Sequence, residues 1–170
     1  MLSNFWPKEK IAAWEAEIFP NAEHNPGIET ARDLITLSEN AHSMWNRGAF
    51  ALKPISVSDD HTTITIQFFW QAKHEDQATM NLLTTPQSTK DLDYNIGAFG
   101  GNGRSTLIDT RRNPFHTVKS GDIFQLQTDD SEARPLPSFT LLEMQWFLQR
   151  ITGMAGAADV EEDWGEGGWD

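Results

Sequence analysis

The side chains in this sequence that could do acid–base or metal chemistry are its five histidines and its carboxylates. The chain has no cysteine, which excludes disulfides, thiol catalysis and every thiolate metal site. A divalent metal site must therefore use imidazole and carboxylate ligands, and a catalytic ion usually takes about three of them from the protein. The histidines to be weighed are His24, His42, His61, His74 and His116.

Four of these histidines stand in ordinary polar or turn contexts. His61 follows two aspartates in a predicted turn, His74 lies among charged residues, and His116 follows an Asn-Pro-Phe segment. We expect all three to be solvated turn residues, because such positions are usually exposed. His24 lies in a predicted loop beside Glu23, which could form half of a ligand pair, but a neighbouring acid and histidine are common by chance.

His42 differs because it lies on a predicted short helix. Ser38 has the residue type and position of an N-cap, and Gly48 is of the type that follows a helix end. A helical histidine with Met44 and Trp45 nearby is more often a packed, hydrogen-bonded side chain than a ligand. Both interpretations of His42, as core filling and as a metal ligand, stay open on these grounds.

The sequence around His42 favours the ligand interpretation. The run from 33 to 52, DLITLSENAHSMWNRGAFAL, resembles the second half of the HNH-type (ββα-metal) nuclease domain, and the resemblance is strongest to a group known from filamentous fungi. That group reads approximately Asn-Leu-Ile-Thr-Leu-Ser, three residues, His, two residues, Trp, then Gly, one residue and Phe-Ala-Leu. Trp45, Gly48 and Phe50 match its structural positions, and the similarity covers most of residues 5–158.

The resemblance implies a metal-dependent endonuclease, a hydrolase that acts on nucleic-acid phosphodiesters. In such domains a first-motif histidine is the general base, and one divalent cation, Mg²⁺ or Zn²⁺, stabilises charge on the phosphate. His42 matches the helical metal ligand of the family. Asp33 occupies the position of the family's middle Asn, which makes it the candidate catalytic residue of this chain. It can still accept a hydrogen bond, but it adds negative charge and lacks the amide donors.

The first motif of the family normally precedes the first helix of this chain, and no residue before Met1 supplies it. One histidine cannot hold a catalytic divalent ion. We therefore expect a truncated or catalytically degenerate nuclease-like domain, unless His24 or a second chain completes the site.

The net charge of −12 argues against a nucleic-acid partner. A domain that grips phosphates normally has a basic face, and here 13 Lys and Arg stand against 25 Asp and Glu. This favours the alternative function, a non-catalytic protein-interaction module that uses the Trp-rich C-terminal helix and the acidic tail. An unrelated small acidic enzyme has least support, since the segment 100–105 lacks the Lys-Ser/Thr ending of a phosphate-binding P-loop.

The helices and strands expected around these residues indicate an α+β fold. The patterns favour helices over 7–19, 38–47 and 139–154, strands over 50–55, 62–70, 106–110 and 122–128, and a short extended run over 34–37. Residues 21–29 and 71–103 are expected to be irregular, with a mobile loop at 100–103. The result is a ββα-metal-like remnant, a short helix plus a hairpin, flanked by an N-terminal helix, extra strands and a C-terminal helix.

The chain length predicts one domain over 1–156, followed by a disordered acidic Gly/Trp tail over 157–170. No apolar run approaches the roughly 18 residues of a membrane span, and no basic-then-apolar leader opens the chain. We therefore expect no membrane partner. The absence of cysteine fits a reducing, intracellular location, either cytoplasmic or nuclear.

Overall fold

A three-stranded antiparallel sheet and three helices make up most of the computed structural model, which describes residues 6–18, 31–71, 88–96 and 103–155. The sheet has the order β1 (Phe50–Val57), β2 (Thr63–Trp70), β7 (Ile123–Gln127). The helices are α1 (Lys8–Ile18), α2 (Glu39–Asn46) and α3 (Phe139–Ala155), and a 3₁₀ turn spans Ala31–Asp33. The α+β class predicted from the sequence is confirmed. No helix in these ranges is long and apolar enough to cross a membrane.

The predicted hairpin of β1 and β2 is present and has one buried face. Phe50 pairs with Trp70 and Leu52 with Phe68, so these four side chains lie on the same face of the sheet. Along β2 the side chains alternate between buried and half-buried, as the Thr/Ile alternation predicts. The register shifts between Pro54 and Ser56, which marks a β-bulge in β1.

The turn of this hairpin is fixed by one carboxylate. Asp60 Oδ1 accepts hydrogen bonds from Ser58 Oγ (2.6 Å) and from the N–H (3.1 Å) and Oγ1 (2.9 Å) of Thr62. These hydrogen bonds lower the pKa of Asp60 to about 2, because each stabilises the charged form. The bond from the Ser58 side chain has the largest effect, and those from Thr62 come next. The turn predicted at 58–60 is confirmed.

Aromatic rings fill the centre of the buried face. Phe50 stacks on Phe68 with ring centroids 4.8 Å apart, and Trp70 meets Phe68 edge-on at 4.9 Å. Trp45 of α2 lies 5.3 Å from Phe50, and the Trp70 Nε1–H donates to the Val118 carbonyl at 2.9 Å. These rings remove a large apolar area from water, and the buried indole N–H of Trp70 keeps a partner.

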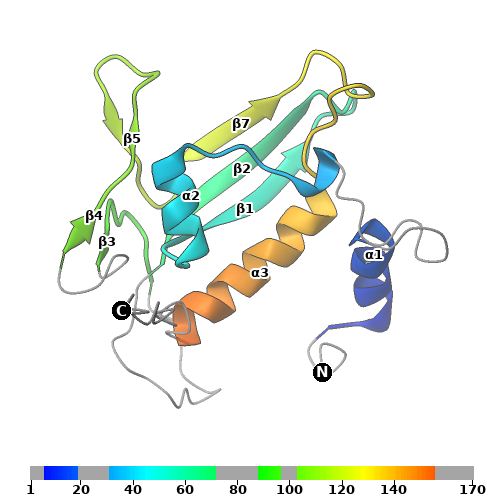
Figure 1. Ribbon diagram of the computed structural model, residues 1–170, viewed down its shortest axis with the longest axis horizontal. Coiled ribbons are helices and arrows are strands. Elements are labelled where there is room, and N and C mark those ends of the chain that lie inside the picture. The colour runs from blue at the N-terminus through cyan, green and yellow to red at the C-terminus, as the bar shows by residue number, and fades with distance from the viewer. Residues whose placement is uncertain (1–5, 19–30, 72–87, 97–102, 156–170) are drawn as a thin grey trace, which may run out of the picture.

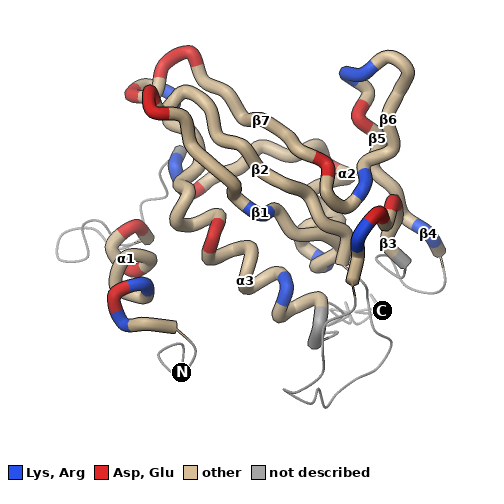
Figure 2. The backbone as a smooth tube through the Cα atoms, turned by 180° about the vertical axis from the view of Figure 1, so that it is seen from behind, with Lys and Arg blue, Asp and Glu red and all other residues tan. Residues whose placement is uncertain are grey.

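Helix α3 lies along the outer edge of β1 (Figures 1 and 2). The Ser138 Oγ accepts from the Leu141 N–H at 3.3 Å, which confirms the predicted N-cap. Trp146 lies 5.1 Å from Phe69 on one face of the sheet, whereas Leu142 belongs to the core on the other face. Helix α1 packs outside α3, where Lys10 Nζ is 2.9 Å from Glu143 Oε1.

The segment between the hairpin and β7 has more structure than the sequence indicates. Strand β3 (Asn95–Ile96) pairs with β4 (Arg104–Ser105), and β5 (Ile108–Asp109) pairs with β6 (His116–Thr117). The irregular stretch expected over 71–103 is therefore wrong at β3, and the strand expected over 106–110 is two residues long. Residues 34–37 form no strand; Ile35 and Leu37 pack against the core instead. The predicted loop at 21–29, most of that at 100–103 and the tail at 157–170 lie outside the described residues.

Five elements meet at the base of the hairpin through buried polar groups. We call this the hairpin-base network; its members are Trp45, Ala49, Gln71, Asn95 and Gln149. Gln149 Nε2 donates to the Trp45 carbonyl (3.1 Å), and Gln71 Nε2 donates to the Gln149 carbonyl (2.8 Å). Asn95 Nδ2 donates to the carbonyls of Ala49 (2.9 Å) and Gln71 (2.5 Å). The network ties α2, α3 and β3 to the ends of β1 and β2.

Glycine is required where α2 turns into β1. Gly48 has a φ of +65°, its N–H donates to the Trp45 carbonyl (3.0 Å), and the Ala49 N–H donates to the Met44 carbonyl (3.0 Å). This pair of bonds is the Schellman arrangement, in which a left-handed residue ends the helix.

We predict that Gly48→Ala lowers the free energy of unfolding by about 1–2 kcal/mol, because an L side chain strains the left-handed backbone. Urea denaturation measures the change. The matched control is Gly103→Ala, since an added Cβ there meets nothing within 4 Å and its φ is not positive. Equal stability of the two variants would show that Gly48 is not conformationally required.

We also predict that Asn95→Asp lowers the free energy of unfolding by about 3 kcal/mol. The side chain of Asn95 is 1% exposed, and aspartate of the same shape would remove both donors and bury a charge. Urea denaturation at pH 7 measures the loss, with Gln127→Glu on the exposed part of β7 as the control. Equal losses of unfolding free energy in Asn95→Asp and Gln127→Glu would contradict a special role for Asn95.

Candidate functional site

His42 lies on the solvent side of α2 and is not part of the core. It is exposed, whereas Ala41 and Met44 on the same helix are buried. At about 100° per helical residue, His42 lies about 160° around the helix from Met44 and about 100° from Ala41, so it points away from the buried side. The interpretation of His42 as a packed core histidine is therefore wrong, and its ring is accessible to a ligand.

The helix that carries His42 is fixed at both ends. Ser38, at φ −63° and ψ 155°, is the predicted N-cap, and its Oγ accepts from the Ala41 N–H at 3.4 Å. At the other end Gly48 closes the Schellman turn, and the Trp45 carbonyl accepts from Gln149 of α3. Trp45, Gly48 and Phe50, the structural positions of the family pattern, thus hold α2 against β1 and α3. His42 is an accessible imidazole on a rigid support.

Asp33 ends the 3₁₀ turn five residues before the cap of α2, and it is exposed. The turn is tied to α3, because the Arg32 carbonyl accepts from the Ser138 N–H at 2.8 Å. Among the described residues there is no group of three or more His, Asp or Glu side chains that could hold a metal ion. His24 and His74 lie outside those residues.

The remaining histidines have different surroundings. His61 is exposed at a φ of +55° in the β1–β2 turn, as predicted. His116 is half-buried, and its Nε2 lies 2.7 Å from Asp122 Oδ2, an oxygen that also accepts from the Lys119 N–H at 2.8 Å. This acid–histidine pair was missed from the sequence, because six residues and a turn separate its members. Among the described residues the pair belongs to no group of three or more His, Asp or Glu side chains that could hold a metal ion.

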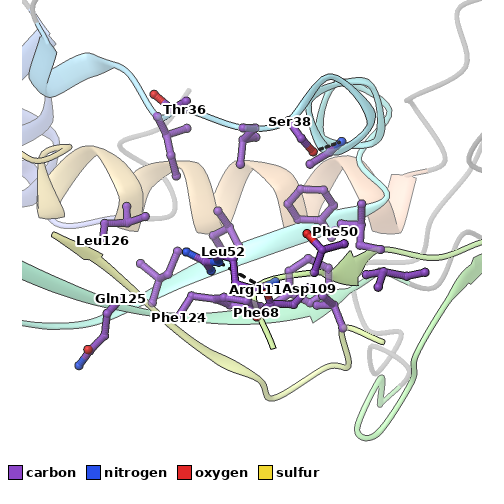
Figure 3. Close-up of a pocket in the computed structure, with 18 residues that line it drawn as sticks. Thr36, Ser38, Phe50, Leu52, Phe68, Asp109, Arg111, Phe124, Gln125 and Leu126 are labelled. Atoms are coloured by element: carbon purple, nitrogen blue, oxygen red, sulfur yellow. Dashed lines mark hydrogen bonds and ion pairs between the residues drawn. The ribbon is translucent and has the colours of Figure 1, made fainter. Parts of the chain in front are cut away.

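A groove of about 430 Å³ opens over the buried face of the sheet, next to α2 (Figure 3). We call it the apolar groove. Its floor is formed by side chains of β1, β2 and β7, its roof by residues 35–38 with Ala41, and one wall by residues 107–111 with Val118. The volume lies within the range of about 300–1,000 Å³ found for ligand pockets. Sequence patterns did not predict the groove, because its three sides come from distant segments.

A buried carboxylate holds two arginines beside the apolar groove. Asp109 Oδ1 accepts from the Nε of Arg111 (3.3 Å) and Asp109 Oδ2 from the Nε of Arg112 (3.1 Å). The Asp109 side chain is 8% exposed, whereas those of Arg111 and Arg112 are 77% and 47% exposed. Burial raises the pKa of Asp109, but the hydrogen bonds from Arg111 and the two positive charges outweigh it, so the pKa lies below its usual value.

Comparisons with known proteins add no relative to these observations. No family model matches the chain, and neither the curated proteins nor the solved structures contain one that matches it. The functional argument therefore rests on the residues of this chain.

We predict that Asp109→Asn lowers the free energy of unfolding at pH 7 and that the difference shrinks below about pH 4. The folded pKa is depressed, so the ionised carboxylate stabilises the fold above the unfolded pKa. That contribution disappears as the pH falls through the folded pKa. Urea denaturation across pH 3–7 measures it, with Asp129→Asn, whose carboxylate is 77% exposed, as the control. A stability difference between the wild type and Asp109→Asn that is independent of pH would contradict a stabilising role for the ionised Asp109 carboxylate.

Proposed function

We propose that the chain is an HNH-nuclease-like domain in which His42 is the helix-borne ligand of a divalent metal ion, in a domain type that acts on nucleic-acid phosphodiesters. The observation that carries the proposal is the exposure of His42 on a helix fixed at both ends. A metal ligand must be accessible and rigidly held, whereas a histidine that fills the core must be buried.

The ligand set of the described residues alone is incomplete, so no catalytic step is assigned through the metal. An imidazole suits Zn²⁺ and other transition ions better than Mg²⁺, which prefers oxygen ligands. Further ligands and a general base must come from outside the described residues, where His24 is one candidate, or from a second chain. Asp33, at the middle-Asn position of the family pattern, keeps an acceptor role in this proposal.

A second candidate function is the non-catalytic protein-interaction module. It is favoured by exposed apolar side chains on α3, where Leu148 and Ile151 are 37% and 46% exposed and lie three residues apart on one face. Phe139 at the start of the helix is also 36% exposed. Such a module needs no metal, and the net charge of −12 does not oppose a protein partner.

We predict that the full chain binds Zn²⁺ and that His42→Ala weakens this binding about tenfold or more. Removing a direct ligand lowers the metal affinity by more than removing a residue that only supports a ligand. Alanine is a good helix former at this exposed position, so the fold is retained. Isothermal titration calorimetry with ZnCl₂ measures the affinity. The matched control is His61→Asn, which removes another exposed imidazole while tolerating a φ of +55°.

Unchanged Zn²⁺ affinity in His42→Ala would contradict the ligand role of His42. A wild-type chain that binds no divalent ion would favour the interaction module. Cleavage of a supercoiled plasmid, measured with and without EDTA, tests the nuclease activity separately from metal binding.

A further inference from the structure

One wall of the apolar groove lies beside exposed, positively charged side chains. Its floor includes the side chains of Leu126 and Phe124, and its wall ends at Arg111, with Arg112 next in sequence. Asp109 neutralises only one of these two guanidinium groups and holds both in place. The groove therefore offers an apolar cavity next to a net positive mouth, which is suited to an aromatic side chain flanked by carboxylates.

The charges of the described residues are unevenly placed. Figure 2 shows Asp and Glu at the loops that join β1 to β2 and β7 to α3, at the end of the sheet far from β5 and β6. The side of β3–β6 carries Lys and Arg together with Asp, so its described residues are close to neutral; the cations include Arg104 on β4 and Arg111 and Arg112 after β5. In a chain of net charge −12, an acidic segment meets less repulsion on this side than at the acidic loops at the far end of the sheet.

The C-terminal segment of the chain has the complementary composition. Trp164 directly follows Glu161, Glu162 and Asp163, and residues 157–170 contain six acids and no base. We propose that this segment docks on its own chain, with the Trp164 side chain in the apolar groove and the acids before it opposite Arg111 and Arg112. The proposal is independent of the role of His42.

The tether is long enough for this contact. A path from the end of α3 to the groove can be followed along two helices, because Gln149 on α3 is hydrogen-bonded to Trp45 on α2. It runs from Ala155 to Gln149 and then from Trp45 to Ser38, which lines the groove. Its length is about 25–30 Å at 1.5 Å per helical residue. The nine residues 156–164 span up to about 30 Å when extended, at 3.3–3.6 Å per residue. Trp164 is therefore about the first residue after α3 that can reach the groove.

Paramagnetic relaxation in the full chain tests the proposal. The natural sequence has no cysteine, so Gly165→Cys gives a single attachment point for a nitroxide label. We expect the label to remove most of the intensity of the Leu107 and Leu126 methyl signals in the groove, and to leave Val57 at the far end of β1 unaffected. The intensity should return when the label is reduced and when the salt concentration is raised, because the ion pairs are exposed.

Variants in the labelled chain separate the parts of the contact. Trp164→Ser should restore the groove signals, whereas the matched Trp169→Ser should not. The pair Arg111→Gln and Arg112→Gln should also restore them, whereas Arg134→Gln, which changes an exposed arginine in another loop, should not.

Three results would overturn the proposal. Broadening that spreads evenly over the surface would show that the tail has no fixed contact. Broadening that survives both Trp164→Ser and the double arginine variant would show a different contact. Broadening of an isotope-labelled chain by a separate spin-labelled chain, at a level that depends on concentration, would place the tail of a second copy in the groove.

Discussion

The hairpin-base network is the constraint on which the arrangement of the other elements depends. Gln149 is 7% exposed and Asn95 is 1% exposed, and buried amides are stable only when they keep their hydrogen bonds. Their partners are main-chain carbonyls of Trp45, Ala49 and Gln71, which belong to different segments. Gly153 allows the close approach, because a Cβ there would lie 3.0 Å from the Gln71 side chain. One set of relative positions allows the side-chain N–H groups of Asn95, Gln71 and Gln149 to donate all of these hydrogen bonds.

This constraint gives α2 its place and therefore separates two kinds of surface. The buried side of α2 rests on Phe50 and α3, and the opposite side presents His42 to solvent. Ala41, the residue before His42, lines the apolar groove. A candidate metal ligand and a candidate docking groove thus share one short helix, although the first depends on accessibility and the second on exclusion of water.

The candidate site was predicted from the sequence only in part. The position of His42 on a capped helix followed from Ser38, Gly48 and the spacing between them, which are local signals. Whether its ring is buried did not follow, because Met44 and Trp45 nearby are compatible with either side of the helix. The His116–Asp122 pair and the arginines held by Asp109 were missed, since each depends on turns in the 104–122 segment that leave no periodic pattern.

The sequence by itself determined the α+β class, the hairpin, the ends of α2 and α3 and the absence of thiol chemistry. Those features depend on alternation, capping residues and composition, which act over a few neighbouring residues. The tertiary structure alone decided the pairing of β7 with β2, the two short ribbons, the network at the hairpin base and the apolar groove. These join residues far apart in the chain, and their geometry is set by the packing of whole elements and the pairing of buried polar groups, which no local pattern encodes.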